Sequence, residues 1–179
     1  MAEECPAGGG PSEPSRSVST DDGAGEPAPG SFEGFYRTYA ETLRRALCLA
    51  VGEVDLGTDA ADEAMARTCE RWVEVSGYAN PSGWAYRVGV NWAHSHQRRL
   101  KFRSPRPIPD SVWSPVAGDP DLAAALVRLP LDRRAVIVCR YYLDWSVDQT
   151  AAALDVPAGT VKSRLARSLD MLKQHLEGQ

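Results

Sequence analysis

The sequence predicts an all-α protein with two small helical domains joined by a proline-rich linker. Apolar residues recur at helical spacing in several stretches, and no stretch alternates apolar and polar residues as a half-buried strand would. Five prolines fall between residues 104 and 121 and separate the two helical halves. We therefore expect two small bundles on a string. The expected divisions are a disordered acidic tail over 1–30, a helical domain over 31–103, a linker over 104–121 and a second helical domain over 122–176.

The composition excludes several classes of protein. The chain has 179 residues, of which 43% are hydrophobic, an ordinary share for a globular protein. It contains no apolar run long enough to span a membrane, and its N-terminus lacks the basic start and apolar core of a secretory signal. Its four cysteines are scattered with no Cys-x-x-Cys pair, so we expect no zinc site, no disulfide framework, no cofactor and a cytoplasmic location.

Charge is strongly segregated, although the net charge is only −4. Residues 1–31 hold six acids against the single Arg16, whereas residues 84–106 hold six bases and no acid. Because the local distribution of charge decides where a polyanion can dock, the negative net charge does not exclude binding to nucleic acid.

Three helices are expected in the first domain. The first runs from Ser31 to about Ala50, and its shared apolar face consists of Phe32, Phe35, Tyr36, Tyr39, Leu43 and Leu47. A turn over 52–57 leads to a second helix over about 59–75, and a loop rich in Gly, Asn and Pro leads to a third over about 81–102.

The second helix carries an acidic stripe opposite its apolar side. The stripe consists of Asp59, Asp62, Glu63 and Glu70. Acids near a helix start are favoured by the helix dipole alone, which is the ordinary explanation. An acidic face cannot bind the negatively charged DNA backbone, so any partner of this face is expected to be a basic protein surface.

The third helix has two faces. We expect one to pack inward through Trp84, Val88, Trp92 and Ser95. The adjacent stripe consists of Arg87, Asn91, His94 and Arg98, and the end of the helix adds Arg99, Lys101 and Arg103. Arg and Asn are suited to bidentate contact with bases, and clustered cations attract phosphates. The competing explanation for the end cluster is a solvated helix C-terminus.

About the last fifty residues predict a helix-turn-helix. Ser146 and Gln149 form a capping box, and Asp155 and Pro157 end the helix that follows. A second helix restarts near Thr160 and is expected to bury the stripe Val161, Leu165, Leu169, Leu172 and Leu176. Its other sides present a candidate DNA-reading set consisting of Thr160, Lys162, Ser163, Arg164 and Arg167.

Four separated motifs resemble the extracytoplasmic-function (ECF) sigma factors, the small two-domain sigma subunits of bacterial RNA polymerase. The resemblance covers residues 32 to about 175. Its motifs are Phe32-x-x-Phe35-Tyr36-x-x-Tyr39, Asp59-Ala60-Ala61-Asp62-Glu63-Ala64, Asn80-Pro81-x-x-Trp84-x-Tyr86-Arg87-Val88-x-x-Asn91, and Leu129-Pro130 through Gly159-Thr160-Val161-Lys162-Ser163-Arg164-Leu165. Many members have Gln where this chain has Asp62, and many have Gly where it has Asp155.

The resemblance implies roles for these residues and names the partners. Core RNA polymerase would bind through its clamp helices and flap, and promoter DNA at the −10 and −35 elements. The clamp helices would contact Asp59, Asp62 and Glu63; the −10 element would contact Arg87, Asn91, His94, Arg98, Arg99 and Lys101; the −35 element would contact Thr160, Lys162, Ser163, Arg164 and Arg167. A loop over 76–80 would help to hold a flipped base. Whether an anti-sigma factor binds the chain stays open.

Two other functions are compatible with parts of the sequence, a free-standing regulator and a helical enzyme. A free-standing helix-turn-helix regulator explains the second domain, but it leaves the acidic face and the Arg87/Asn91 stripe without a role. A helical enzyme using His94 and His96 is disfavoured, because side chains two residues apart on a helix point in nearly opposite directions. We expect binding without catalysis, by an adaptor with two separate basic helices. Packing of the two helices into one closed core with hidden cationic sides would contradict this expectation.

Overall fold

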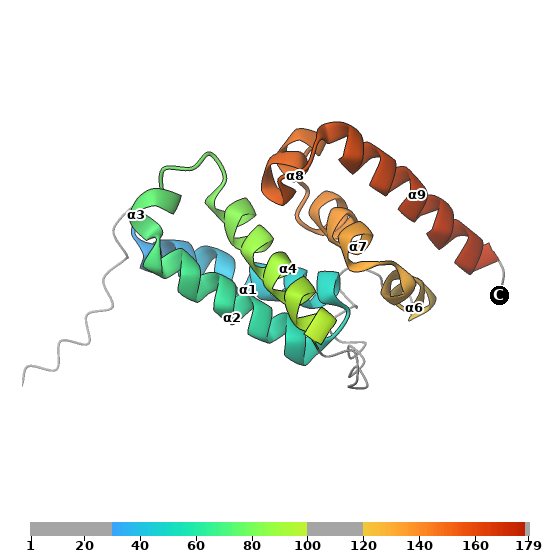
Figure 1. Ribbon diagram of the computed structural model, residues 1–179, viewed down its shortest axis with the longest axis horizontal. Helices are drawn as coiled ribbons and strands as arrows, with labels where there is room; N and C mark the ends of the chain where they lie inside the picture. Colours follow the sequence, from blue (N-terminus) through green and yellow to red (C-terminus); the bar gives the residue numbers. More distant parts are fainter. Residues whose placement is uncertain (1–29, 100–119, 178–179) are drawn as a thin grey trace, which may run out of the picture.

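The computed structural model describes residues 30–99 and 120–177, and every regular element in this part of the chain is helical (Figure 1). The elements in chain order are α1 (Phe32–Val51), α2 (Val54–Glu70), α3 (Trp72–Val75), α4 (Pro81–Arg99), α6 (Pro120–Arg128), α7 (Leu131–Ile137), the π-helical turn η1 (Val138–Tyr142), α8 (Val147–Leu154) and α9 (Ala158–Glu177). The all-α prediction is confirmed. The predicted acidic tail and most of the predicted linker lie outside the described residues.

Helices α1 to α4 form the N-terminal unit. Helix α1 begins because the Ser31 hydroxyl accepts a hydrogen bond from the Gly34 amide at 3.1 Å, and it ends at Gly52, which has a φ of 79°. Helix α2 begins at Val54, earlier than the predicted start near residue 59. Of the aromatic residues expected on the buried face of α1, Tyr36 and Tyr39 are 49% and 41% exposed.

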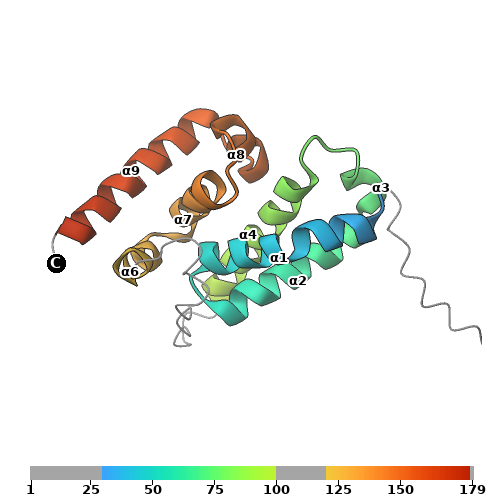
Figure 2. The same ribbon diagram turned by 180° about the vertical axis from the view of Figure 1, so that it is seen from behind.

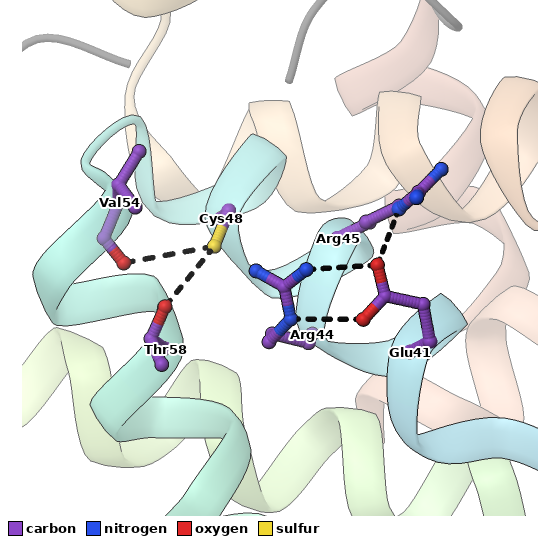
Figure 3. A network of polar contacts seen from close by, with 6 residues as sticks. All are labelled: Glu41, Arg44, Arg45, Cys48, Val54 and Thr58. Carbon is purple, nitrogen blue, oxygen red and sulfur yellow. Dashed lines mark hydrogen bonds and ion pairs between the residues drawn. The ribbon is translucent and has the colours of Figure 1, made fainter. Parts of the chain in front are cut away.

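The helices of this unit cross very closely at two glycines. A Cβ on Gly57 of α2 would lie 2.5 Å from the Cα of Cys48 on α1. A Cβ on Gly89 of α4 would lie 2.5 Å from a methyl group of Leu47. Figure 3 shows the first crossing, where the Cys48 thiol faces the Val54 carbonyl and the Thr58 hydroxyl. Helix backbones can approach this closely only where no side chain intervenes.

Helices α6 to α9 form the C-terminal unit, and its helix-turn-helix matches the prediction at both ends of α8. Ser146 and Gln149 make both hydrogen bonds of the capping box, at 3.1 and 2.8 Å. Asp155 ends α8 in the left-handed conformation, with a φ of 56°. The predicted buried stripe of α9 is only partly right, because Leu169 and Leu176 are 41% and 42% exposed.

The two predicted helical domains are present as two units, and in the described residues these units also pack against each other, a contact that the expected bundles on a string did not include. Helices α7 and η1 lie against α1, and α8 lies against α4 (Figures 1 and 2). One cluster of buried side chains runs through both units. A separate, smaller cluster consists of Val136, Ala151 and Val161 inside the helix-turn-helix.

This packing explains why the predicted inward face of α4 is wrong. Ser95 is exposed, and the three other residues expected to face inward are only partly buried. The buried residues of α4 are Gly83, Ala85, Tyr86, Gly89, Val90 and Ala93. Helix α4 lies between α2 on one side and α8 on the other, and the second contact cannot be inferred from the periodicity of the first unit.

Candidate nucleic-acid and protein interfaces

The basic stripe of α4 is largely open to solvent. Asn91, His94 and Arg98 are exposed, whereas Arg87 is half-buried and forms an ion pair with Asp155 at 3.3 Å. Arg99 is the last residue of α4, and Lys101 lies outside the described residues. The structure therefore places five of the six predicted −10 residues along one helix and joins one of them, Arg87, to the C-terminal unit.

A polar hollow of about 340 Å³ lies beside this stripe, between α2 and α4. It is lined by Arg67, Asn91, Trp92, Ser95 and His96. The rings of Trp92 and His96 are stacked, with centroids 4.1 Å apart. Arg67 was not predicted as a site residue, because it stands alone among the acids of the second helix; its neighbours in the hollow come from another helix.

Tyr78, in the loop between α3 and α4, lies near Trp84 of α4, with ring centroids 6.5 Å apart. The Arg71 guanidinium lies 5.5 Å from the centroid of Trp84, and it pairs with Glu74 at 2.6 Å. Glu74 also accepts a hydrogen bond from the Tyr78 hydroxyl, and these two contacts, the Tyr78 bond first, lower the pKa of the Glu74 carboxyl. Cation and ring are thus held beside the segment that the resemblance assigns to a flipped base.

The acidic stripe lies on the surface of α2, as predicted. Asp59, Asp62 and Glu70 are exposed. Glu63 is partly buried and pairs with Arg67 at 2.6 Å, so its charge is partly compensated by its own helix. The exposed acids form a surface that a basic protein partner can approach.

Most of the predicted DNA-reading residues of α9 are accessible. Lys162, Ser163 and Arg167 are exposed, and Thr160 is partly buried. Arg164 is also partly buried and pairs with Asp132 of α7 at 3.4 Å. The cationic side of α9 is therefore not hidden by the packing of the two units.

A buried arginine that the sequence analysis missed joins the two units. Arg134 of α7 donates hydrogen bonds to the carbonyls of Ala50 and Val51, both at 2.6 Å. It also donates to the carbonyls of Leu126 and Val127, at 3.3 and 2.8 Å. The guanidinium therefore caps the C-terminal ends of α1 and α6 at once. Burial lowers the pKa of Arg134 to about 10, so it stays charged at neutral pH.

The interface continues along α4. The fully buried Tyr86 donates a hydrogen bond to the carbonyl of Ala135 at 3.3 Å and meets the ring of Trp145 edge-on, with centroids 5.8 Å apart. Beside it lies a cavity of about 160 Å³ lined by Arg87, Val90, Asn91, Asp132, Ala135, Leu154, Val156 and Arg164. Residues predicted for two separate promoter elements thus face one cavity.

Comparison with known proteins agrees with this architecture. Residues 121–172 match the family described as Sigma-70, region 4. The RNA polymerase sigma-E factor of Streptomyces antibioticus is 32% identical over 154 residues, covering 82% of this chain and 84% of that protein. The ECF RNA polymerase sigma factor SigL of Mycobacterium tuberculosis is 29% identical over 153 residues, covering 79% and 86%.

The sigma factor RpoE, solved in complex with the anti-sigma factor NepR from Bartonella quintana, has a similar fold. Its TM-score is 0.69 at 19% identity, over 82% of this chain and 96% of that chain. The helical fold in two units, together with the helix-turn-helix, places the chain among the transcription proteins. The chain belongs to the ECF sigma factors of the sigma-70 family, as the motifs predicted. In the part of the chain that the structure describes, no helix has the length and apolarity needed to cross a bilayer.

Proposed function

We propose that this RNA polymerase sigma factor docks on the core enzyme through the acidic stripe of α2 and reads the −10 and −35 elements with α4 and α9. The observation that supports this division most is the separation of charges: the acids of α2 and the bases of α4 and α9 are exposed on different helices. An acidic surface fits the clamp helices, and the basic surfaces fit DNA.

Reading two promoter elements requires the units to separate. Elements centred about 25 base pairs apart lie roughly 85 Å apart at 3.4 Å per base pair. One cavity holds Arg87 and Arg164, so the packed form cannot place them at both elements. Residues 104–121, fully extended, reach roughly 55–60 Å, which allows the units to move well apart.

Strand opening needs no chemistry from the chain. Captured bases offset the few kcal/mol of unstacking at the −10 element. Asn91 and Arg98 on α4, with Tyr78 and Trp84 near the loop, supply hydrogen bonds, charge and stacking surfaces. The sigma factor contributes binding, the polymerase supplies catalysis, and the site of action is the cytoplasm.

Transcription in vitro with purified core polymerase and a library of promoter fragments tests the proposal. We expect Asn91→Ala and Arg98→Ala to reduce promoter opening at least tenfold while core binding survives, since each removes a contact made only with DNA. The double change Asp62→Lys and Glu63→Lys should abolish copurification with core polymerase.

Arg37→Ala, at an exposed arginine of α1, is the matched control and should leave both readouts unchanged. Loss of core binding in the Asn91→Ala protein, or retention of core binding in the charge-reversed protein, would contradict the proposed division of surfaces. Tight, sequence-specific binding of promoter duplex by the free protein would favour a free-standing helix-turn-helix regulator instead.

A further inference from the structure

The polar hollow between α2 and α4 lies inside the N-terminal unit, where these two helices run side by side (Figures 1 and 2). Its volume of about 340 Å³ falls within the range of roughly 300–1,000 Å³ that small-molecule sites have. It is separate from the loop assigned to a flipped base, because His96 comes about 22 Å along the axis of α4 from Pro81. The hollow is therefore large enough to hold a ligand of its own.

A pair of stacked rings lines the α4 side of the hollow. The rings of Trp92 and His96, one helical turn apart, have centroids 4.1 Å apart and planes inclined by 23°. Both side chains are only partly buried. A planar heterocycle can extend such a stack, because offset ring faces attract one another and every nucleobase has a π-face. The rings therefore favour an aromatic ligand over a simple anion.

The α2 side of the hollow supplies a cation. Arg67 pairs with Glu63 through its Nε and Nη2 groups, which both contact one carboxylate oxygen at 2.6 Å. A guanidinium has five N–H donors, so the Nη1 group of Arg67 takes no part in this ion pair. Arginine N–H groups are strong donors to phosphate oxygens. A phosphate group is therefore the part of a ligand that fits this side.

An amide that can read the edge of a base also lines the hollow. The exposed side chain of Asn91 offers a donor and an acceptor together, a combination that matches N6 and N7 of adenine. The hydroxyl of Ser95, which lines the hollow as well, donates to the backbone carbonyl of Asn91 at 3.0 Å, so its donor is satisfied by its own helix. Ring stack, amide and cation match the base face, the base edge and the phosphate of a nucleotide.

We propose that the hollow between α2 and α4 is a binding site for one adenine nucleotide. The base extends the Trp92–His96 stack, the amide of Asn91 contacts the base edge, and the guanidinium of Arg67 binds the phosphate. An unpaired nucleotide of a promoter strand and a free nucleotide both offer this chemistry. The first source rests on the proposed function, because it assumes that α4 meets promoter DNA, whereas the second does not.

The first test titrates the free full-length protein with AMP and with adenosine and follows binding by calorimetry. We expect AMP to bind about fivefold more tightly than adenosine, because only AMP brings a phosphate to Arg67. Arg67→Gln should abolish this difference. Arg37→Gln is the matched control, because Arg37 pairs with Glu33 at 2.6 Å in the same i, i+4 arrangement on α1 and does not line the hollow. A preference for AMP that survives Arg67→Gln would overturn the inference.

The second test addresses the ring stack. His96→Ala should weaken AMP binding about tenfold, and His96→Phe, which restores a ring, should recover it. Because His96 is only partly buried, thermal unfolding should show that both proteins remain folded. An affinity for AMP that His96→Ala leaves unchanged, or inorganic phosphate that displaces AMP as well as unlabelled AMP does, would overturn the inference, since either result means that no base is recognised.

Single-stranded hexadeoxyadenylate distinguishes the two sources. Binding of this strand more tightly than AMP, with the same loss in the His96→Ala protein, assigns the site to the promoter strand; binding of AMP at least as tightly assigns it to a free nucleotide. A wild-type protein that binds neither ligand overturns the inference. Promoter opening by the wild-type holoenzyme would then leave the proposed function intact, whereas a wild-type holoenzyme that opens no promoter contradicts the proposed function itself.

Discussion

The two units bury their apolar surface in different ways. The N-terminal unit closes on itself, with α1, α2 and α4 crossing at Gly57 and Gly89 closely enough to exclude any side chain. The C-terminal unit has only a small cluster of its own around Val136 and Val161, and much of its remaining buried surface belongs to the core shared with α1 and α4. The first unit thus has close helix crossings of its own, whereas the second depends more on the core that the two units share.

This difference in packing indicates which part of the molecule regulation can act on. The close helix crossings of the first unit hold the acidic surface of α2 and the proposed −10 surface of α4 next to each other. The polar contacts that join the second unit to the first include the hydrogen bonds of Arg134 and Tyr86 and one ion pair, Arg87–Asp155. The capping box and the small cluster around Val136 and Val161 lie within the C-terminal unit itself.

The largest expected effect on the contact between the two units comes from Arg134. We expect Arg134→Ala to cost about 3 kcal/mol of the free energy of closing, since it removes charged hydrogen bonds to two carbonyls of α1. We expect thermal unfolding to show one transition in the wild type and two in the Arg134→Ala protein, with the C-terminal unit unfolding first. The neighbouring Arg133→Ala, whose guanidinium contacts Met171 within its own unit, is the control. A single unshifted transition would show that Arg134 does not hold the units together.

A smaller effect is expected inside the N-terminal unit. Gly57→Ala places a methyl group 2.5 Å from the backbone of Cys48, which cannot rotate away. Overpacking costs about 1–3 kcal/mol, offset by the roughly 1 kcal/mol that Ala gains over Gly in a helix, so we expect a net loss of up to about 2 kcal/mol in urea unfolding. Gly159→Ala in α9, where nothing lies within 4 Å, should be neutral or stabilising. Equal changes in unfolding free energy for Gly57→Ala and Gly159→Ala would contradict the difference in packing between the two positions.

The smallest effect concerns the surface of α1, where Figure 3 shows Glu41 between Arg44 and Arg45. The Arg44 hydrogen bond first, and the Arg45 bond second, hold the pKa of the Glu41 carboxyl below its ordinary value of 4.5. A lowered folded pKa stabilises the protein above pH 4.5, and this contribution is lost as pH falls through the folded value. Glu41→Gln should cost less than about 1 kcal/mol at pH 7, because the side chain is 57% exposed.

The measurement is urea unfolding of the wild type and the Glu41→Gln protein as a function of pH. Their difference in unfolding free energy should shrink below pH 4.5. A difference that stays constant down to the acid-unfolding range would assign the effect to packing and not to charge.

What could be predicted from the sequence rests on local interactions. The capping box at Ser146, the left-handed stop at Asp155 and the helical period of each stretch act within a few residues, so the helices and the helix-turn-helix followed from the sequence alone. The basic and acidic stripes followed for the same reason, because they need only helical spacing. The early start of α2 does not follow from the sequence, because Gly57 fits a turn equally well and its role as a point of close helix contact depends on α1.

The tertiary structure alone shows which surfaces are in contact. Periodicity shows that a face of α4 is apolar enough to bury, but it does not say that α8 covers it, and so Tyr86 and not Ser95 faces the core. Nor can a sequence show that Arg134 caps a helix more than eighty residues away, or that Arg87 and Arg164 share a cavity. These contacts join residues that are distant along the chain, and their free energy exists only once the two units are packed together.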